Sequence, residues 1–178
     1  SNVILYLRST LLDRGFYLTQ DDLPDPTQPG EMVNHRNSPD LKLSLPDNTG
    51  NFPLPTAINF EQFNNLLPDA WPEDTTIDQP QVRVYIEVHN RGPKPANGVG
   101  VMLLGAPVTG DNLPPLPPGF AGDVQDNDQI ISSEWKTFGT QAVNDVRAGF
   151  PKIVCFTIDT KLITRDNHQP YSLLALAY

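Results

Sequence analysis

Apolar and polar residues alternate along several short stretches of this chain, and the clearest case is residues 82–89, VRVYIEVH. In an extended strand successive side chains point to opposite faces, so this stretch separates into an apolar face and a mixed polar face. The apolar face holds Val82, Val84, Ile86 and Val88, and the other face holds Arg83, Tyr85, Glu87 and His89. The pattern predicts a half-buried antiparallel strand with its polar face toward solvent.

Similar short runs recur along the whole chain, whereas apolar residues at helical spacing are scarce. The stretches that we expect to form strands are residues 3–8, 41–45, 82–89, 99–104, 134–139, 152–158 and 171–177. The best helical run, residues 58–67, predicts no more than a single turn or a loop staple before Pro68. Short strands joined by turn-rich segments predict an all-β protein with an antiparallel β-sandwich fold.

The segments between the strands are rich in turn formers, and 19 prolines exclude helix interiors and central strands at many positions. Residues 111–122, DNLPPLPPGFAG, are expected to adopt polyproline II geometry. This run contains P-x-x-P twice, at Pro114 to Pro117 and at Pro115 to Pro118, but no basic residue lies within it. We therefore expect a rigid connector packed through Leu113, Leu116 and Phe120 rather than a peptide ligand.

The predicted domain organisation is a single sandwich with an N-terminal appendage. We expect residues 1–40 to supply one strand and a wrapping arm, and residues 41–178 to form the sandwich. The strand at residues 3–8 then packs either on its own sandwich or on a neighbouring subunit's sheet. The expected core comprises Val84, Ile86, Val88, Val101, Leu103, Trp135, Val154, Phe156, Leu173 and Ala175.

Charge and composition limit the classes of partner and the location that we expect for this chain. The 21 acidic and 12 basic side chains give a formal net charge of −9, which repels phosphate backbones, so we expect no nucleic-acid partner. No apolar run is long enough to span a bilayer, so we expect a soluble chain without membrane insertion. The first 20 residues lack a signal-peptide pattern, but a removed signal peptide would leave no trace, and we favour an extracellular or cell-surface location.

The only cysteine, Cys155, lies in the apolar run KIVCFTI, so no internal disulfide can form. A thiol in such a run is expected to be buried and inert, because a reactive thiol needs a nearby base or cation.

Residues 84–104, VYIEVHNRGPKPANGVGVMLL, resemble the core hairpin of CARDB-like domains, a bacterial and archaeal group of immunoglobulin-like sandwiches. The matching positions are Val84, Ile86, Val88, Asn90, Gly92, Ala96, Val99, Val101 and Leu103. The resemblance implies the fold and an adhesive or accessory role, and it carries no shared catalytic residue. The turn chemistry agrees with a hairpin, because Asn90, Gly92 and the pair Asn97-Gly98 can adopt positive φ at low cost. Asn90 can also hydrogen-bond the turn backbone.

Residues that could carry chemistry do not form a known motif. The three histidines, His35, His89 and His168, are far apart in sequence and none belongs to an H-E-x-x-H motif, so we expect no metal site and no cofactor. Asp123, Asp126, Asn127 and Asp128 offer oxygen ligands for calcium, but their spacing departs from the EF-hand pattern and favours a solvated turn. The cluster Asp21, Asp22 and Asp25 is a weaker candidate.

Two functions follow as expectations. The first is a non-enzymatic interaction or structural module, a surface, adhesive or assembly component that binds a protein partner or itself. The alternative is an accessory carbohydrate-binding or hydrolytic unit that binds a glycan. In the alternative, exposed Tyr85, Trp71 or Trp135 stacks on sugar rings while Glu87 or Glu134, facing each other across strands, supplies a carboxylate.

Overall fold

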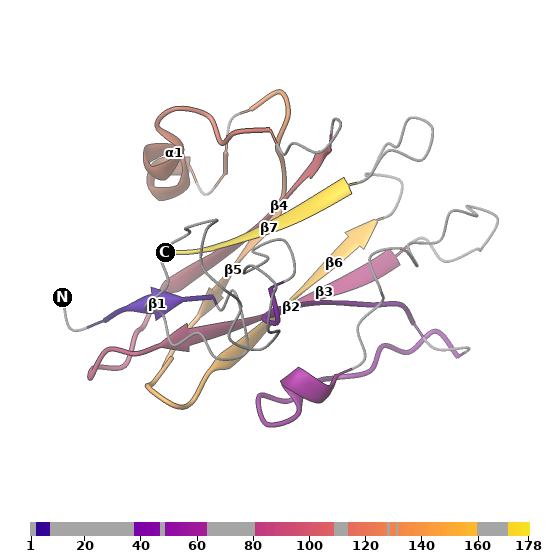
Figure 1. The fold of residues 1–178 in the computed structure, drawn as a ribbon, viewed down its shortest axis with the longest axis vertical. Coiled ribbons are helices and arrows are strands. Elements are labelled where there is room, and N and C mark those ends of the chain that lie inside the picture. Colours follow the sequence, from indigo (N-terminus) through magenta and orange to yellow (C-terminus); the bar gives the residue numbers. More distant parts are fainter. Residues whose placement is uncertain are drawn as a thin grey trace, which may run out of the picture.

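The computed structural model describes residues 3–7, 38–46, 49–63, 81–108, 114–127, 129–130, 132–159 and 171–178. The elements in chain order are β1 (Leu5–Tyr6), β2 (Leu41–Ser44), the 3₁₀ turn η1 (Phe60–Gln62), β3 (Gln81–Asn90), β4 (Val99–Pro107), α1 (Phe120–Asn127), β5 (Lys136–Val143), β6 (Lys152–Asp159) and β7 (Tyr171–Ala177) (Figure 1). Every predicted strand is present, which confirms the all-β prediction. The boundaries of the strand predicted at 134–139 were wrong, since β5 begins at Lys136 and continues to Val143.

The strands form two antiparallel sheets that pack face to face. In one sheet β3 is central, with β6 along one edge and β2 and β1 on its other side; in the second sheet the order is β5-β4-β7. The N–H groups of Glu87 and Arg91 donate to the carbonyls of Asp40 and Ile4 at 2.9 and 3.0 Å. Because alternate residues of a strand direct their N–H groups to the same edge, β1 and β2 lie one after the other along that edge. The N-terminal strand thus packs on its own sheet.

The expected hairpin between residues 82–89 and 99–104 is wrong. β3 and β4 belong to different sheets, so residues 91–98 carry the chain across the core instead of reversing it within one sheet. Gly98 has the expected positive φ, at 65°, but Asn90 and Gly92 do not. The strands are therefore joined by an arch, and the same turn residues serve it because they provide backbone freedom and side-chain hydrogen bonds.

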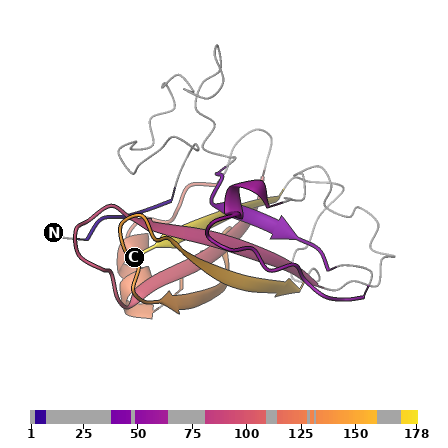
Figure 2. The same cartoon turned by 90° about the horizontal axis from the view of Figure 1, so that it is seen from below.

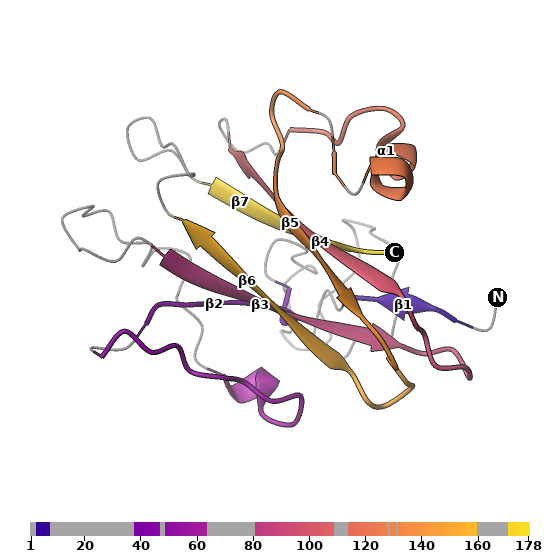
Figure 3. The same cartoon turned by 180° about the vertical axis from the view of Figure 1, so that it is seen from behind.

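The side chain of Asn90 connects this arch to two other segments through hydrogen bonds. Its Oδ1 accepts hydrogen bonds from the N–H groups of Ile4 (3.1 Å) and Gly92 (2.8 Å). Its amide nitrogen donates to the carbonyls of Lys94 (2.8 Å) and Val146 (2.9 Å). The predicted turn bonding of Asn90 is confirmed, and it reaches further than the turn itself. Val146 belongs to the connection between β5 and β6, and Figure 3 shows this connection where the chain crosses from one sheet to the other.

The hydrophobic core fills the space between the two sheets. Seven of the predicted core residues are buried there, namely Val84, Ile86, Val88, Val101, Leu103, Val154 and Phe156. Leu173 and Ala175 of β7 pack against this core and are half-buried. Trp135 is also buried, but the expectation that it joins the same core is wrong, because it packs on the opposite face of β4.

That opposite, outer face of β4 carries a second apolar cluster. Met102, Leu104 and Ala106 are fully buried beneath Val124 of α1, Ile130 and Trp135. The Trp135 indole N–H donates to the carbonyls of Pro114 and Pro115 at 3.1 and 3.2 Å, and Leu116 and Phe120 pack against the cluster. The connector expectation is confirmed for Leu116 and Phe120, while Leu113 lies outside the described residues. The polyproline II expectation is wrong for residues 120–122, which begin α1.

Two glycines allow aromatic rings to approach β4 closely. A Cβ at Gly105 would overlap Cε2 of Phe138 and lie 2.5 Å from Cε1 of Tyr171. A Cβ at Gly100 would lie 2.5 Å from Cζ of Tyr178, whose backbone exchanges two 2.9 Å hydrogen bonds with Gly100. The flanking strands can therefore place rings directly over the backbone of β4.

Candidate functional site

Residues 49–63 cover the outer face of β3, the face that the sequence assigned to solvent. Tyr85 has an exposed fraction of 1%, its hydroxyl donates to the carbonyl of Pro53 at 2.6 Å, and the ring of Phe63 meets it edge-on. The Arg83 guanidinium lies 4.4 Å from the centroid of the Phe52 ring. The prediction of a half-buried strand is therefore wrong, because a segment distant in sequence packs on the polar face.

The covering segment is held by the turn η1. Phe60 is the fully buried residue of this turn, while Ile58, two residues earlier, has an exposed fraction of 98%. The expected single turn within residues 58–67 is confirmed at Phe60–Gln62, but Ile58 does not contribute its apolar surface. Figures 1 and 2 show η1 and α1 at opposite sides of the molecule, so each sheet has its own cover.

Where β1, β2 and β3 meet, three ionisable side chains converge. Asp40 and Glu87 have exposed fractions of 1% and 2%, and the side chain of His89 is 13% exposed. Nε2 of His89 lies 3.2 Å from Oδ2 of Asp40 and 3.5 Å from Oε2 of Glu87. One ligand-type atom from each residue lies within 4.8 Å of the other two. We call these three residues the carboxylate–histidine group.

The sheet itself sets the positions of the carboxylate–histidine group. Glu87 and His89 are two residues apart on β3 and therefore share a face. The backbone bond from the Glu87 N–H to the Asp40 carbonyl fixes the residue before β2 beside them, and the Asp40 N–H is bound by Ser38 Oγ at 3.2 Å. The Tyr6 ring of β1 stacks on the His89 imidazole, with centroids 5.2 Å apart and planes 26° apart. Contacts from β1, from the segment before β2 and from β3 thus fix the group.

Two buried carboxylates beside an imidazole can form either a shared ion pair or a cation-binding site. They can share the positive charge of a protonated imidazole, or they can ligate a cation together with the neutral imidazole. Attack on a sugar is not available to them, since a glycosidic bond would have to reach carboxylates that are almost fully covered. Sequence analysis had placed Glu87 and His89 on one face but not Asp40, because the β2–β3 register that brings it there is a tertiary property.

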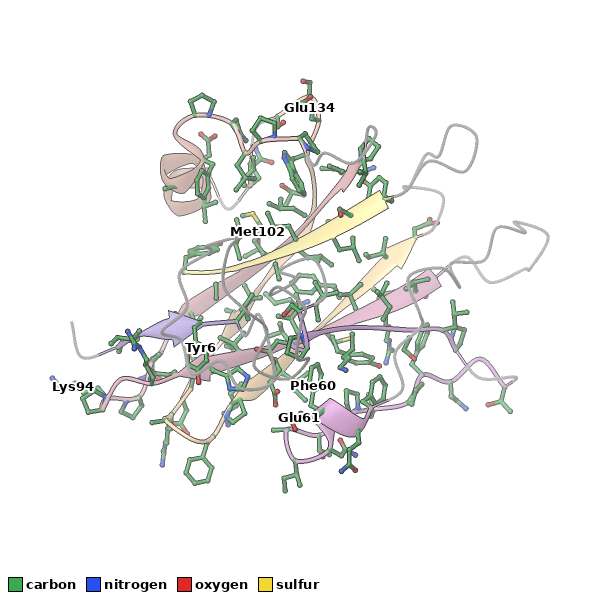
Figure 4. The ribbon with its side chains drawn as sticks, in the orientation of Figure 1. Tyr6, Phe60, Glu61, Lys94, Met102 and Glu134 are labelled. Atoms are coloured by element: carbon green, nitrogen blue, oxygen red, sulfur yellow. The ribbon has the colours of Figure 1, made fainter. Side chains whose placement is uncertain are left out.

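The predicted carboxylate pair of Glu87 and Glu134 is wrong. Glu87 is buried on β3, whereas Glu134 is exposed in the segment before β5, which belongs to the other sheet. In Figure 4 Glu134 lies at one end of the molecule, while Tyr6, which stacks on His89, lies far from it. The predicted exposure of Tyr85 and Trp135 is also wrong, since both are buried, and Trp71 lies outside the described residues.

The other candidate ligands are only partly described. Asp123 lies on α1 and is half-buried, which places it on a short helix rather than in the expected turn. The side chains of Asp126 and Asn127, and all of Asp128, lie outside the described part of the structure. Whether these residues bind calcium or form a solvated turn therefore stays a prediction from the sequence. Asp21, Asp22, Asp25, His35 and His168 also lie outside the described residues.

Cys155 lies on β6, opposite Tyr85 of β3, and is half-buried rather than part of the core. Burial raises the pKa of its thiol above the ordinary value, and the positive charge of Arg83 offsets part of this effect. The predicted location in the core is therefore wrong. The predicted low reactivity agrees with the direction of the pKa, because the thiolate is the reactive form.

No protein-family model, curated protein or solved structure significantly matches the chain. Within the described residues, no helix is long and apolar enough to cross a membrane.

Proposed function

We propose that this chain is a non-enzymatic interaction or structural module with an immunoglobulin-like, CARDB-like fold, acting as a surface, adhesive or assembly component. The order of the strands supports the fold. In immunoglobulin-like sandwiches strands A, B and E share one sheet, and strands C and F share the other, joined in some by C′. The orders β2-β3-β6 and β5-β4-β7 correspond to A-B-E and C′-C-F when the strands are lettered along the chain.

The observation that carries the proposed role is that the chain covers the outer faces of both central strands with its own segments. Residues 49–63 lie on β3, and the segment around α1 lies on β4. A glycan that stacks on a sheet needs an open face with exposed rings. Among the described residues, loops and strand edges offer exposed surface that suits contacts with another protein chain.

Exposed apolar side chains on the loops support a protein partner. Leu54 and Ile58 are largely exposed on the segment that covers β3, and Phe150 is largely exposed in the turn between β5 and β6. Burial of apolar surface is the dominant favourable contribution to most protein–protein association. We therefore assign contact with a protein partner or a second copy to these loops.

The test is size-exclusion chromatography with light scattering at several protein concentrations, followed by a glycan-array screen. We expect a mass above that of one chain and no glycan binding. Ile58→Ser should lower that mass if the covering segment makes the contact. Glu134→Gln, a polar control at another exposed position, should not.

The alternative, an accessory carbohydrate-binding or hydrolytic unit, makes the opposite predictions. A strict monomer that binds one class of sugar and cleaves it contradicts our proposal. Buried Tyr85 and Trp135 weaken this alternative, because neither ring can serve as a stacking platform.

A further inference from the structure

We propose that Asp40, Glu87 and His89 bind one divalent transition-metal cation, and that Zn²⁺ fits this ligand set best. The site is separate from the exposed loops of the proposed function and does not depend on it. Its role is to fasten the start of β2 to β3, because Asp40 precedes β2 while Glu87 and His89 belong to β3.

The distances between the ligand atoms match a metal site. In a tetrahedral zinc site with bonds of about 2.1 Å, neighbouring ligand atoms are about 3.4 Å apart. Nε2 of His89 lies 3.2 Å from Oδ2 of Asp40 and 3.5 Å from Oε2 of Glu87. The carboxylate oxygens are within 4.8 Å of each other. The three ligand atoms therefore already lie close enough together to share one cation.

The burial of both carboxylates suits a divalent cation. Both carboxylates are almost fully buried, and buried charges are stable only when they are compensated. A divalent cation bound by both carboxylates and a neutral imidazole supplies such compensation.

The ligand types select the class of cation. One imidazole nitrogen with two carboxylate oxygens suits Zn²⁺, with Mn²⁺ as the next candidate, whereas Ca²⁺ takes six to eight oxygens. The backbone bond between Glu87 and Asp40 and the stacking of Tyr6 on His89 hold the donors in place. Little reorganisation is then needed on binding, which favours affinity.

The test is a calorimetric titration of the full chain with Zn²⁺ after treatment with EDTA and removal of the chelator. The wild-type chain should bind one equivalent and unfold at a higher temperature with Zn²⁺. Glu87→Gln and Asp40→Asn keep the side-chain shapes but remove an anionic ligand, so each should weaken binding by roughly tenfold or more. Glu134→Gln and Asp123→Asn are matched controls and should bind like wild type.

Failure of the wild-type chain to take up one equivalent overturns the proposal, and so does a Glu87→Gln chain that binds as tightly as wild type. If the substituted chains do not fold, imidazole ¹⁵N spectra of the wild type decide. Zn²⁺ should then shift the Nε2 resonance of His89 and leave those of His35 and His168 in place. A His89 resonance that does not move overturns the assignment.

Discussion

The outer faces of β3 and β4 are both buried by other parts of the chain, but the chemistry of the two covers differs. On β4 the buried contacts are apolar, with Met102 and Leu104 under Trp135. On β3 they also include polar and ionisable groups, with Tyr85 bonded to a carbonyl and Glu87 beside His89. Figure 4 shows Met102 and Phe60, which mark the two regions, well apart. An apolar cover depends on area and shape, while a polar cover depends on each group finding a suitable counterpart.

The difference also decides which of the two buried strand faces can be predicted from the local sequence pattern. The run from Val99 to Ala106 is almost continuously apolar, which is typical of a strand buried on both faces. The alternation in β3 is identical to that of a strand with one face in water. Burial of a polar face therefore leaves no local signal, and its discovery requires the covering segment.

The largest effect should come from the apolar cover. Trp135→Ala removes the indole from the cluster on β4 and its hydrogen bonds to Pro114 and Pro115. We expect a loss of about 3–5 kcal/mol in the free energy of unfolding, measured by urea denaturation. Trp135→Phe keeps most of the apolar area and should cost clearly less. A loss for Trp135→Ala below about 1 kcal/mol would mean that the cover contributes little to stability.

The polar cover should respond differently to the loss of the imidazole and to the loss of a carboxylate. His89→Gln takes away the imidazole between two buried carboxylates, so in EDTA we expect a loss of about 3–5 kcal/mol in the free energy of unfolding. Glu87→Gln removes one negative charge and keeps the shape of the side chain. Its expected cost is below about 1 kcal/mol. Equal losses for both variants in urea denaturation would contradict the imidazole as the shared partner of both carboxylates.

A smaller effect tests how tightly β4 is held from its inner face. Gly105→Ala places a methyl group against the rings of Phe138 and Tyr171, and we expect a loss of about 1–3 kcal/mol from overpacking. Gly122→Ala in α1 is the control, because a Cβ there meets no atom within 4 Å. Thermal unfolding measures both. Equal midpoints would show that the rings move aside freely.

The smallest effect concerns Cys155, beside the polar cover. Because burial raises the pKa of its thiol, the native chain holds less thiolate near neutral pH than an unfolded chain does. Iodoacetamide should therefore modify native Cys155 several-fold more slowly than it modifies the chain in urea at the same pH. The native rate should rise as the pH is raised further into the alkaline range. Equal rates at neutral pH would contradict this.

The sequence predicted the strands well, because alternation and turn residues are local properties. It failed where the answer depended on distant segments. The arch at residues 91–98 has the same glycines and asparagines as a hairpin, and only the location of β3 and β4 in separate sheets distinguishes the two. Trp135 was correctly placed inside, but on the wrong side of β4. For the carboxylate–histidine group, Glu87 and His89 were visible as neighbours, whereas Asp40 joins them only through strand register.

The hydrogen bonds of Asn90 have a consequence for the order in which the chain folds. They link it to Ile4 and Val146, which are 86 and 56 residues away in the sequence. Contacts between such distant segments require long loops to close, so we expect them to form late on the folding pathway. Asn90→Ala should therefore leave the refolding rate near that of wild type and accelerate unfolding, which stopped-flow chevron kinetics can measure. A slowed refolding arm would instead place Asn90 in the folding nucleus. In that case the hydrogen bonds of Asn90 control the unfolding rate, and so the lifetime of the native state.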